Sequence, residues 1–140
     1  MGNEAGQAIT AGMSIEASQI VTEERTARHM GSGAVRVYST PSMVLFIEET
    51  CHRLAAQHLP EGMSTVGVAL NLQHLAATPV GQRVTVRAEV VRVEGNRITF
   101  RAEVADEAEP IGRAEHDRAI IHVERFLKRV EAKARAGTGG

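Results

Sequence analysis

Aromatic rings, cysteine and an excess of charge of either sign are all scarce in this 140-residue sequence. Only one Tyr and three Phe are present, with no Trp, which is too few for a base-stacking surface or an aromatic sugar platform. Sixteen Lys and Arg against seventeen Asp and Glu leave a formal net charge of -1, which excludes the broad basic field of a nucleic-acid binder. The single cysteine, Cys51, excludes an internal disulfide framework and a multi-cysteine metal site, and favours a reducing compartment.

Long apolar runs are missing as well. No stretch approaches the roughly 20 apolar residues of a membrane span, and residues 1–12 lack the basic and apolar regions of a secretory signal. The length, with 43% hydrophobic and 24% charged residues, is typical of one soluble globular domain. We therefore expect one cytoplasmic domain over residues 1–140, with an ordered core of about 13–130, flexible ends, and no membrane or nucleic-acid partner.

A buried helix is predicted in the first half of the chain. Pro41 suits the first turn of a helix, and the preceding Thr40 is a preferred N-cap, which is the simplest role for its hydroxyl. The helical pattern runs from Met43 to Leu59 and is ended by Pro60. Its first turns, residues 43–47, are apolar on every side, which predicts that other elements wrap around the helix.

Strands are predicted around this helix. A Gly95-Asn96 loop makes a hairpin that sets Val91 opposite Phe100, and a shift of the hydrophobic phase at Val90-Val91 requires a one-residue bulge. With that bulge, two pairs of opposite charge and two apolar pairs align: Glu89–Arg101, Arg87–Glu103, Ala88–Ala102 and Val86–Val104. The predicted strands are residues 14–26, 63–76 (with Val66, Val68, Leu70 and Leu72 on one face), 82–94, 97–105 and 111–123.

An amphipathic helix is predicted from Val123 onward, with a basic face that is either solvated or a rim for the phosphates of a nucleotide. One central helix enclosed by the antiparallel strands that follow it is the hot-dog arrangement, of the α+β class. Hot-dog domains usually pair edge to edge into dimers, which covers an exposed sheet edge.

Several polar residues stand out against this pattern. Glu48 shares an apolar stripe of the helix and has only His52 as a local partner. An unpaired buried carboxylate has a raised pKa, which suits catalysis. A structural role for Glu48 is equally open. His74 ends a strand beside a loop, and is either a site residue or a structural histidine. Gly67 marks either a bulge or a place where a ligand meets the backbone. Cys51 is most simply a core residue.

Metal binding is not expected, because the histidines form no compact ligand spacing and the His-Glu-x-x-His motif is absent.

Four segments together resemble a known family. Residues 40–51, 67–79, 91–95 and 116–126, which include a His-x-Ala-Ala-Thr-Pro and a His-x-Arg-Ala-x-Ile-His motif, closely resemble the fluoroacetyl-CoA thioesterase-like group of hot-dog proteins. The similarity runs from about Ile20 to Val130. It implies hydrolysis of an acyl-CoA thioester by three residues, Thr40, Glu48 and His74, in a homodimer or higher homo-oligomer, with Gly67 close to the acyl group and Arg118 near the substrate. The implied reaction needs no cofactor besides the CoA of the substrate.

The region before the helix departs from the family pattern. The founding type carries a longer, Phe-bearing segment over the acyl group, whereas here the region is only residues 30–34, with no aromatic residue before Tyr38. We therefore expect short or medium acyl groups without strict fluoroacetyl selectivity.

The spacing of two of the implied site residues restricts the geometry. Thr40 and Glu48 are eight residues apart, or roughly 12 Å along a regular helix. Either the helix start is irregular or the site combines residues of two subunits, and we predict a dimer with composite sites. Two other functions remain open: a non-catalytic acyl-CoA-binding module, and an enoyl-CoA hydratase, for which no Asp lies near Glu48.

Overall fold

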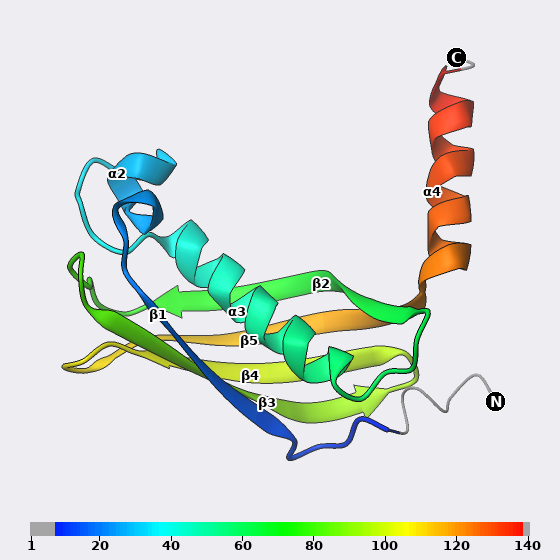
Figure 1. Ribbon diagram of the computed structural model, residues 1–140, viewed down its shortest axis with the longest axis horizontal. Coiled ribbons are helices and arrows are strands. Elements are labelled where there is room, and N and C mark those ends of the chain that lie inside the picture. The colour runs from blue at the N-terminus through cyan, green and yellow to red at the C-terminus, as the bar shows by residue number, and fades with distance from the viewer. Residues whose placement is uncertain (1–7, 139–140) are drawn as a thin grey trace.

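One antiparallel sheet and one long helix make up most of the molecule. The computed structural model describes residues 8–138, in which five strands are ordered β1-β3-β4-β5-β2 and α3 lies across one face of the sheet (Figure 1). The predicted α+β hot-dog arrangement, with its C-terminal helix, is confirmed. The elements are β1 (Ser14–Ile20), the 3-10 turn η1 (Glu23–Arg25), α2 (Ala27–Met30), α3 (Thr40–Ala56), β2 (Met63–His74), β3 (Arg83–Glu94), β4 (Arg97–Ala105), β5 (Pro110–His122) and α4 (Val123–Thr138).

The core lies between α3 and the inner face of the sheet. Alternate residues of the central strands point inward, because side chains of a strand alternate between its faces, and they meet buried residues of α3 including Met43, Ile47 and Leu54. The sheet covers only one side of the helix, however, and Leu45 remains 56% exposed. The prediction that the first turns are enclosed on every side is therefore wrong for this face of a single chain.

The β3–β4 hairpin forms with the predicted bulge. Pairing shifts between Val90 and Arg92, and all four predicted pairs beyond the bulge are present. Val91 is itself the extra residue, so Phe100 lies opposite Val90 rather than opposite Val91.

The start of α3 differs from the prediction by one residue. Ser39, not Thr40, is the N-cap, and its hydroxyl accepts a hydrogen bond from the backbone N–H of Ser42 at 3.1 Å. Thr40 and Pro41 are the first two helical residues. The hydroxyl of Thr40 is thus free of the capping role that we expected for it.

The first strand is shorter than predicted. It ends at Ile20, after which η1 and α2 lead into the loop that reaches Tyr38. Val21 and Tyr38 are both buried, and the Tyr38 hydroxyl accepts a hydrogen bond from Nε2 of Gln19 at 2.6 Å. This segment is therefore packed into the core by its two ends, while Val35 between them is exposed.

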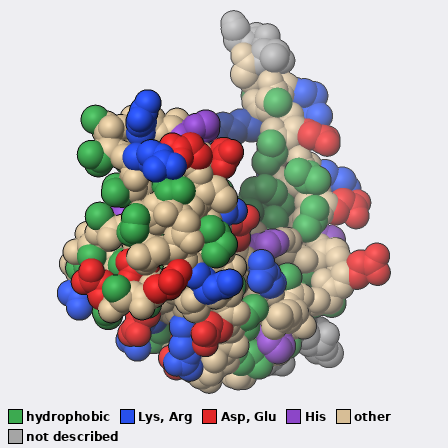
Figure 2. All heavy atoms as spheres, turned by 60° about the vertical axis from the view of Figure 1, so that its left-hand side comes forward, with side chains coloured by type: hydrophobic (Ala, Val, Ile, Leu, Met, Phe, Trp, Pro, Cys, Tyr) green, Lys and Arg blue, Asp and Glu red, His purple; other side chains and the backbone are tan. Residues whose placement is uncertain are grey.

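The last helix, α4, extends away from the end of the sheet (Figure 1). Hydrophobic side chains lie along one side of it and charged ones along the other (Figure 2). Leu127 and Val130 are about half exposed. On the surface of the helix lie two ion pairs, Glu124–Lys128 and Glu131–Arg135, each of which joins residues one helical turn apart. The helix is amphipathic as predicted, and its apolar side is largely uncovered in one chain.

The ends of the chain were expected to be flexible outside residues 13–130. Residues 1–7 and 139–140 lie outside the described part of the chain. Within it, Ile9 is buried in the core and α4 continues to Thr138. None of the described helices is long and apolar enough to span a membrane.

Candidate active site

The first cluster of candidate residues lies at the N-terminus of α3. The hydroxyl of Thr40 is 2.8 Å from Nδ1 of His74, which is the last residue of β2. Because Ser39 caps the helix, Thr40 can use its hydroxyl for this contact. Partial burial lowers the pKa of His74 below its ordinary 6.5, although a hydrogen bond to the backbone of Ala76 opposes that shift. The imidazole is therefore neutral at physiological pH and can accept a proton.

The second cluster surrounds Glu48, two turns further along α3. The Oε2 atom of Glu48 lies 3.8 Å from Nη1 of Arg118 on β5, whose side chain is only 8% exposed. The Glu48 side chain is 40% exposed in a single chain. The sequence prediction of a buried carboxylate is therefore wrong in a single chain, since Glu48 is partly exposed. In addition to the local neighbour His52, the fold supplies a buried guanidinium from a distant strand as its partner.

A bulge in β2 brings the backbone close to this carboxylate. Gly67 pairs with Arg118 and Ala69 with Asp117, so that Val68 is the extra residue of the strand and is 49% exposed. A Cβ on Gly67 would lie 2.9 Å from Oε2 of Glu48, closer than such atoms normally approach. The interpretation of Gly67 as part of a bulge is thus confirmed, while the approach of a ligand to its backbone stays a prediction. The bulge also puts Val66, which pairs with Ala119, on the opposite face from Leu70, which pairs with His116. The prediction that Val66, Val68, Leu70 and Leu72 share one face is therefore wrong.

The Arg118 guanidinium is held by several partners. Its Nε donates to Thr65 Oγ1 at 2.8 Å, and its Nη2 donates to the Thr65 carbonyl at 3.1 Å. Its Nη1 lies 3.1 Å from Nε2 of His116. Burial lowers the pKa of the Arg118 guanidinium, while nearby Cys51 and Glu48 oppose that shift; an arginine remains charged under such conditions.

Two shallow hollows open beside Glu48. One, of about 210 Å³, is lined by Glu48, His116 and the β2 residues 67–70. The other, of about 220 Å³, is lined by Glu48, Arg118, Leu45 and two further residues of α3. Substrate atoms in either hollow would contact the Glu48 carboxylate.

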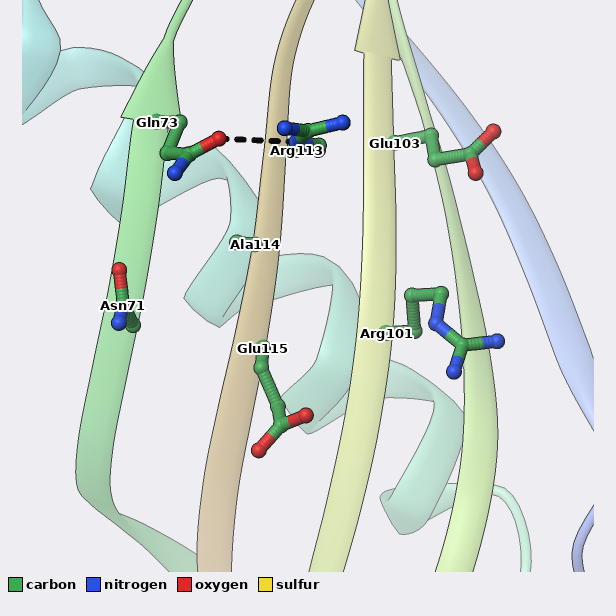
Figure 3. A pocket seen from close by; sticks show the side chains of 7 residues that line it. All are labelled: Asn71, Gln73, Arg101, Glu103, Arg113, Ala114 and Glu115. Atoms are coloured by element: carbon green, nitrogen blue, oxygen red, sulfur yellow. Dashed lines mark hydrogen bonds between the residues drawn. The ribbon is translucent and has the colours of Figure 1, made fainter.

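A larger hollow, of about 360 Å³, lies on the outer face of the sheet, where the side chains of Arg101, Glu103, Arg113 and Glu115 stand on neighbouring strands (Figure 3). Arg113 donates to Gln73 Oε1 at 2.9 Å there. These residues are exposed except for Ala114, and oppositely charged residues lie across from one another on β4 and β5. This hollow is a solvated face of paired charges rather than a site with a group poised for chemistry.

The two clusters do not meet within one chain. Thr40 and Glu48 belong to the same uninterrupted helix, and eight residues of α-helix span roughly 12 Å. The irregular helix start that would bring them together is not present. Within one chain, Thr40–His74 and Glu48–Arg118 are therefore two separate clusters.

Other candidates for chemistry are accounted for by packing. Cys51 is buried, and burial raises its pKa to about 12, so the thiol is a core group as predicted. No group of three or more potential metal-ligating residues occurs within residues 8–138.

His116 is the site residue that sequence reasoning missed. It was considered as a metal ligand and as part of a family motif, without a role in the site. In the structure it is 1% exposed and lies between the β2 bulge and Arg118. The spacing His116-x-Arg118 places both side chains on the inner face of one strand, and this period of two was the available signal.

Comparisons with known proteins show the family of this chain. The sequence model of the fluoroacetyl-CoA-specific thioesterase family matches residues 21–124. The fluoroacetyl-CoA thioesterase of Streptantibioticus cattleyicolor is 37% identical over 124 residues, which cover 84% of this chain and 89% of that protein.

Solved structures give the same relationship. A fluoroacetyl-CoA thioesterase structure superposes with a TM-score of 0.83 at 34% identity, covering 89% of this chain and 97% of the other. A thioesterase superfamily member from Thermus thermophilus has a TM-score of 0.81 at 30% identity, covering 91% and 97%. A hot-dog-like protein from Thermanaerovibrio acidaminovorans, with a TM-score of 0.85 at 23% identity and coverage of 91% and 95%, shares the fold.

Proposed function

This chain belongs to the fluoroacetyl-CoA-specific thioesterase family, and from that premise we propose that it hydrolyses short or medium acyl-CoA thioesters to the free acid and CoA. The observation that carries the proposal is the Glu48 carboxylate, which faces the Gly67 backbone beside a buried Arg118 and borders two open hollows. A carboxylate with this exposure and this partner is available to a reacting carbonyl.

Thioester hydrolysis suits a carboxylate of this kind. Glu48 either attacks the thioester carbonyl directly, which releases the CoA thiolate and leaves an anhydride for water to cleave, or activates the attacking water. The low pKa of a thiol makes the thiolate a good leaving group without a strong acid. In the proposed reaction, the positive charge of Arg118, 3.8 Å from Glu48, stabilises the negative charge that develops on the carbonyl oxygen.

The Thr40–His74 pair supplies the second part of the site. A neutral His74 takes up a proton from water or returns one to the departing thiolate, and the Thr40 hydroxyl 2.8 Å away fixes the orientation of the ring. The backbone N–H groups at the start of α3 add the positive end of the helix dipole at the same place.

A second copy of the chain brings the two parts together. β2 is an edge strand of the sheet. Val68 of this strand and Leu45 of α3 are both exposed, and each lines one of the hollows beside Glu48. Antiparallel pairing of two β2 edges about a two-fold axis carries the His74 end of one strand toward the Met63 end of the other, which contains Gly67. We therefore propose a homodimer in which Glu48 and Arg118 of one subunit act with Thr40 and His74 of its partner.

The scarcity of aromatic rings supports a broad acyl preference. Tyr38, Phe46 and Phe100 are at most 5% exposed, and Tyr38 is fixed by Gln19. None of them can close over an acyl group without leaving the core. Selectivity for fluoroacetyl groups would need such a cover, so the proposed substrates include acyl groups without fluorine. The buried free thiol of Cys51 fits a reducing compartment, and we propose the cytoplasm.

Thiol release from a panel of acyl-CoAs, from acetyl to octanoyl and including fluoroacetyl, tests the proposal. The expected result is turnover of several short or medium chains by the native protein and its loss in Glu48→Gln. Binding of acyl-CoA without turnover of any substrate would instead support a non-catalytic acyl-CoA-binding module, and strict turnover of fluoroacetyl-CoA alone would contradict the broad preference.

A further inference from the structure

His116 is a buried histidine with no assigned role, in contact with two parts of the site. Its Nδ1 lies 2.8 Å from the carbonyl oxygen of Ala69, just after the β2 bulge, and its Nε2 lies 3.1 Å from Nη1 of Arg118. The ring of Phe100 stacks on it with centroids 6.3 Å apart. The position and the plane of the imidazole are therefore fixed on three sides.

These neighbours determine where the proton of the ring resides. A carbonyl oxygen only accepts hydrogen bonds, so Nδ1 of His116 carries the hydrogen that Ala69 receives. A guanidinium only donates, so Nε2 is the unprotonated acceptor for Arg118. Burial also lowers the pKa of His116, with the charge of Arg118 acting in the same direction and the Ala69 contact opposing it. His116 is thus a neutral ring with its lone pair toward Arg118.

The lone pair of His116 matters because of what Arg118 would otherwise contact. The hydrogen bonds of the guanidinium go to Thr65 Oγ1, the Thr65 carbonyl and His116 Nε2, which are all uncharged. The Glu48 carboxylate is 3.8 Å from the same Nη1, which is beyond hydrogen-bond distance. Without an acceptor at His116, Nη1 has one obvious replacement partner, the carboxylate itself.

We propose that His116 is a positioning residue that, through its Nε2 lone pair, keeps Arg118 from forming a direct hydrogen bond with Glu48, so that both carboxylate oxygens remain available to the thioester. The proposal rests on the proposed thioesterase function for its kinetic consequence. Its structural content, namely the tautomer of His116 and the separation of Arg118 from Glu48, is independent of any activity.

Two substitutions separate the two contacts of the ring. In His116→Gln the amide oxygen reaches the place of Nε2 and can accept from Arg118, while in His116→Asn the amide nitrogen takes the place of Nδ1 and can only donate to Ala69. We expect His116→Asn to lower kcat about tenfold or more with KM little changed, and His116→Gln to retain kcat within about threefold. His58→Asn, which lies after α3 and away from the site, is the control.

If His116 only anchored the bulge through Ala69, the order would be reversed: His116→Asn would be active and His116→Gln impaired. That result would overturn the proposal. In an Arg118→Gln background, His116→Asn should cause no further loss of kcat, because the residue through which it acts is gone. A full additional loss in the double variant would also contradict the proposal.

Structural measurements complete the test. The imidazole ¹⁵N chemical shifts of the native protein should show a hydrogen on Nδ1 of His116, and a crystal structure of His116→Asn should show Arg118 Nη1 at hydrogen-bond distance from Glu48. A hydrogen on Nε2, or an unmoved Arg118, would overturn the inference. Lack of turnover by the native protein would contradict only the proposed function, whereas a native rate unchanged by His116→Asn would contradict only the inference.

Discussion

The two faces of the sheet differ in how their charged side chains are paired. On the outer face, Arg101 lies between Glu89 and Glu115 on the neighbouring strands. In the next row, Glu103 lies between Arg87 and Arg113 in the same way. Arg101 and Glu103 thus each have an opposite charge on both sides, and both side chains are exposed.

On the inner side, Arg118 is 6% exposed, and the one carboxylate near it, Glu48, stays 3.8 Å away. A buried cation without a close counter-ion is costly, and the structure retains it beside a backbone segment that has no side chain at Gly67. The larger hollow lies on the outer face, yet the buried and loosely paired charge of Arg118 lies beside the smaller ones. The comparison teaches that incomplete charge pairing locates the site better than the size of a hollow.

Glu48→Gln should have the largest effect of any single substitution that we consider. The amide keeps the size and the Arg118 contact but is neither a nucleophile nor a base, so kcat should fall about 10³-fold or more. Rates of thiol release, with the thermal midpoint as a check of folding, measure this. A loss of less than tenfold would place the reacting group elsewhere.

Two glycines sharpen the comparison between site and core. Gly67→Ala puts a methyl group 2.9 Å from Oε2 of Glu48. Because this oxygen is at the end of a flexible side chain, the carboxylate can move away, so kcat should fall about tenfold with little change in stability. Gly112→Ala puts one 2.5 Å from Sδ of the fully buried Met43, so it should cost about 1–3 kcal/mol of unfolding free energy. Denaturant unfolding and kcat of the folded protein separate the two effects. Equal effects of both substitutions on kcat would contradict this division.

Acid should destabilise the protein through histidines of the inner side. Burial lowers the pKa of both His74 and His116 below the ordinary 6.5. The unfolded chain then binds protons more readily than the folded one, so stability is complete above about pH 6.5 and is lost as the pH falls toward the folded values. We expect the thermal midpoint to fall by a few degrees between pH 7.5 and pH 5.5.

The fall in midpoint should be smaller in His116→Gln, because that variant lacks one of the two histidines. A thermal midpoint of the native protein that rises on acidification would contradict the lowered pKa values of these histidines.

Arg101→Gln on the outer face should have the smallest effect. Its charge is exposed and has two acidic neighbours, and such surface contacts are worth about 0–1 kcal/mol. We expect a change in stability within about 0.5 kcal/mol and an unchanged kcat. A large loss of activity in this variant would make the outer hollow a functional site and break the comparison.

The β3–β4 hairpin could be predicted in detail from the sequence because its signals are local. The hairpin around Gly95-Asn96 and the bulge at Val91 follow from the alternation of side chains and from opposite charges across the strands. The helix cap could not be assigned, since Ser39 and Thr40 are both good caps and only the tertiary contact with His74 separates their roles.

The surroundings of Glu48 could not be predicted, because they depend on residues far apart in the chain. The helix alone offers His52 as a neighbour, whereas the structure supplies Arg118 and Gly67 from β5 and β2. The bulge in β2 decides which residues of that strand face the carboxylate, and its position within 67–69 follows from pairing with β5. Thus the identities of the candidate residues came from sequence, and their partners from the fold.

The central claim is that Glu48 of one subunit acts with His74 of another, and mixing two inactive variants tests it most directly. Glu48→Gln and His74→Ala are each prepared alone, then unfolded together and refolded as an equal mixture. If the sites are composite, each mixed dimer regains one intact site, and the mixture should recover up to about a quarter of native activity. If both residues act within one chain, no intact site can form, and a mixture as inactive as its components would contradict the account.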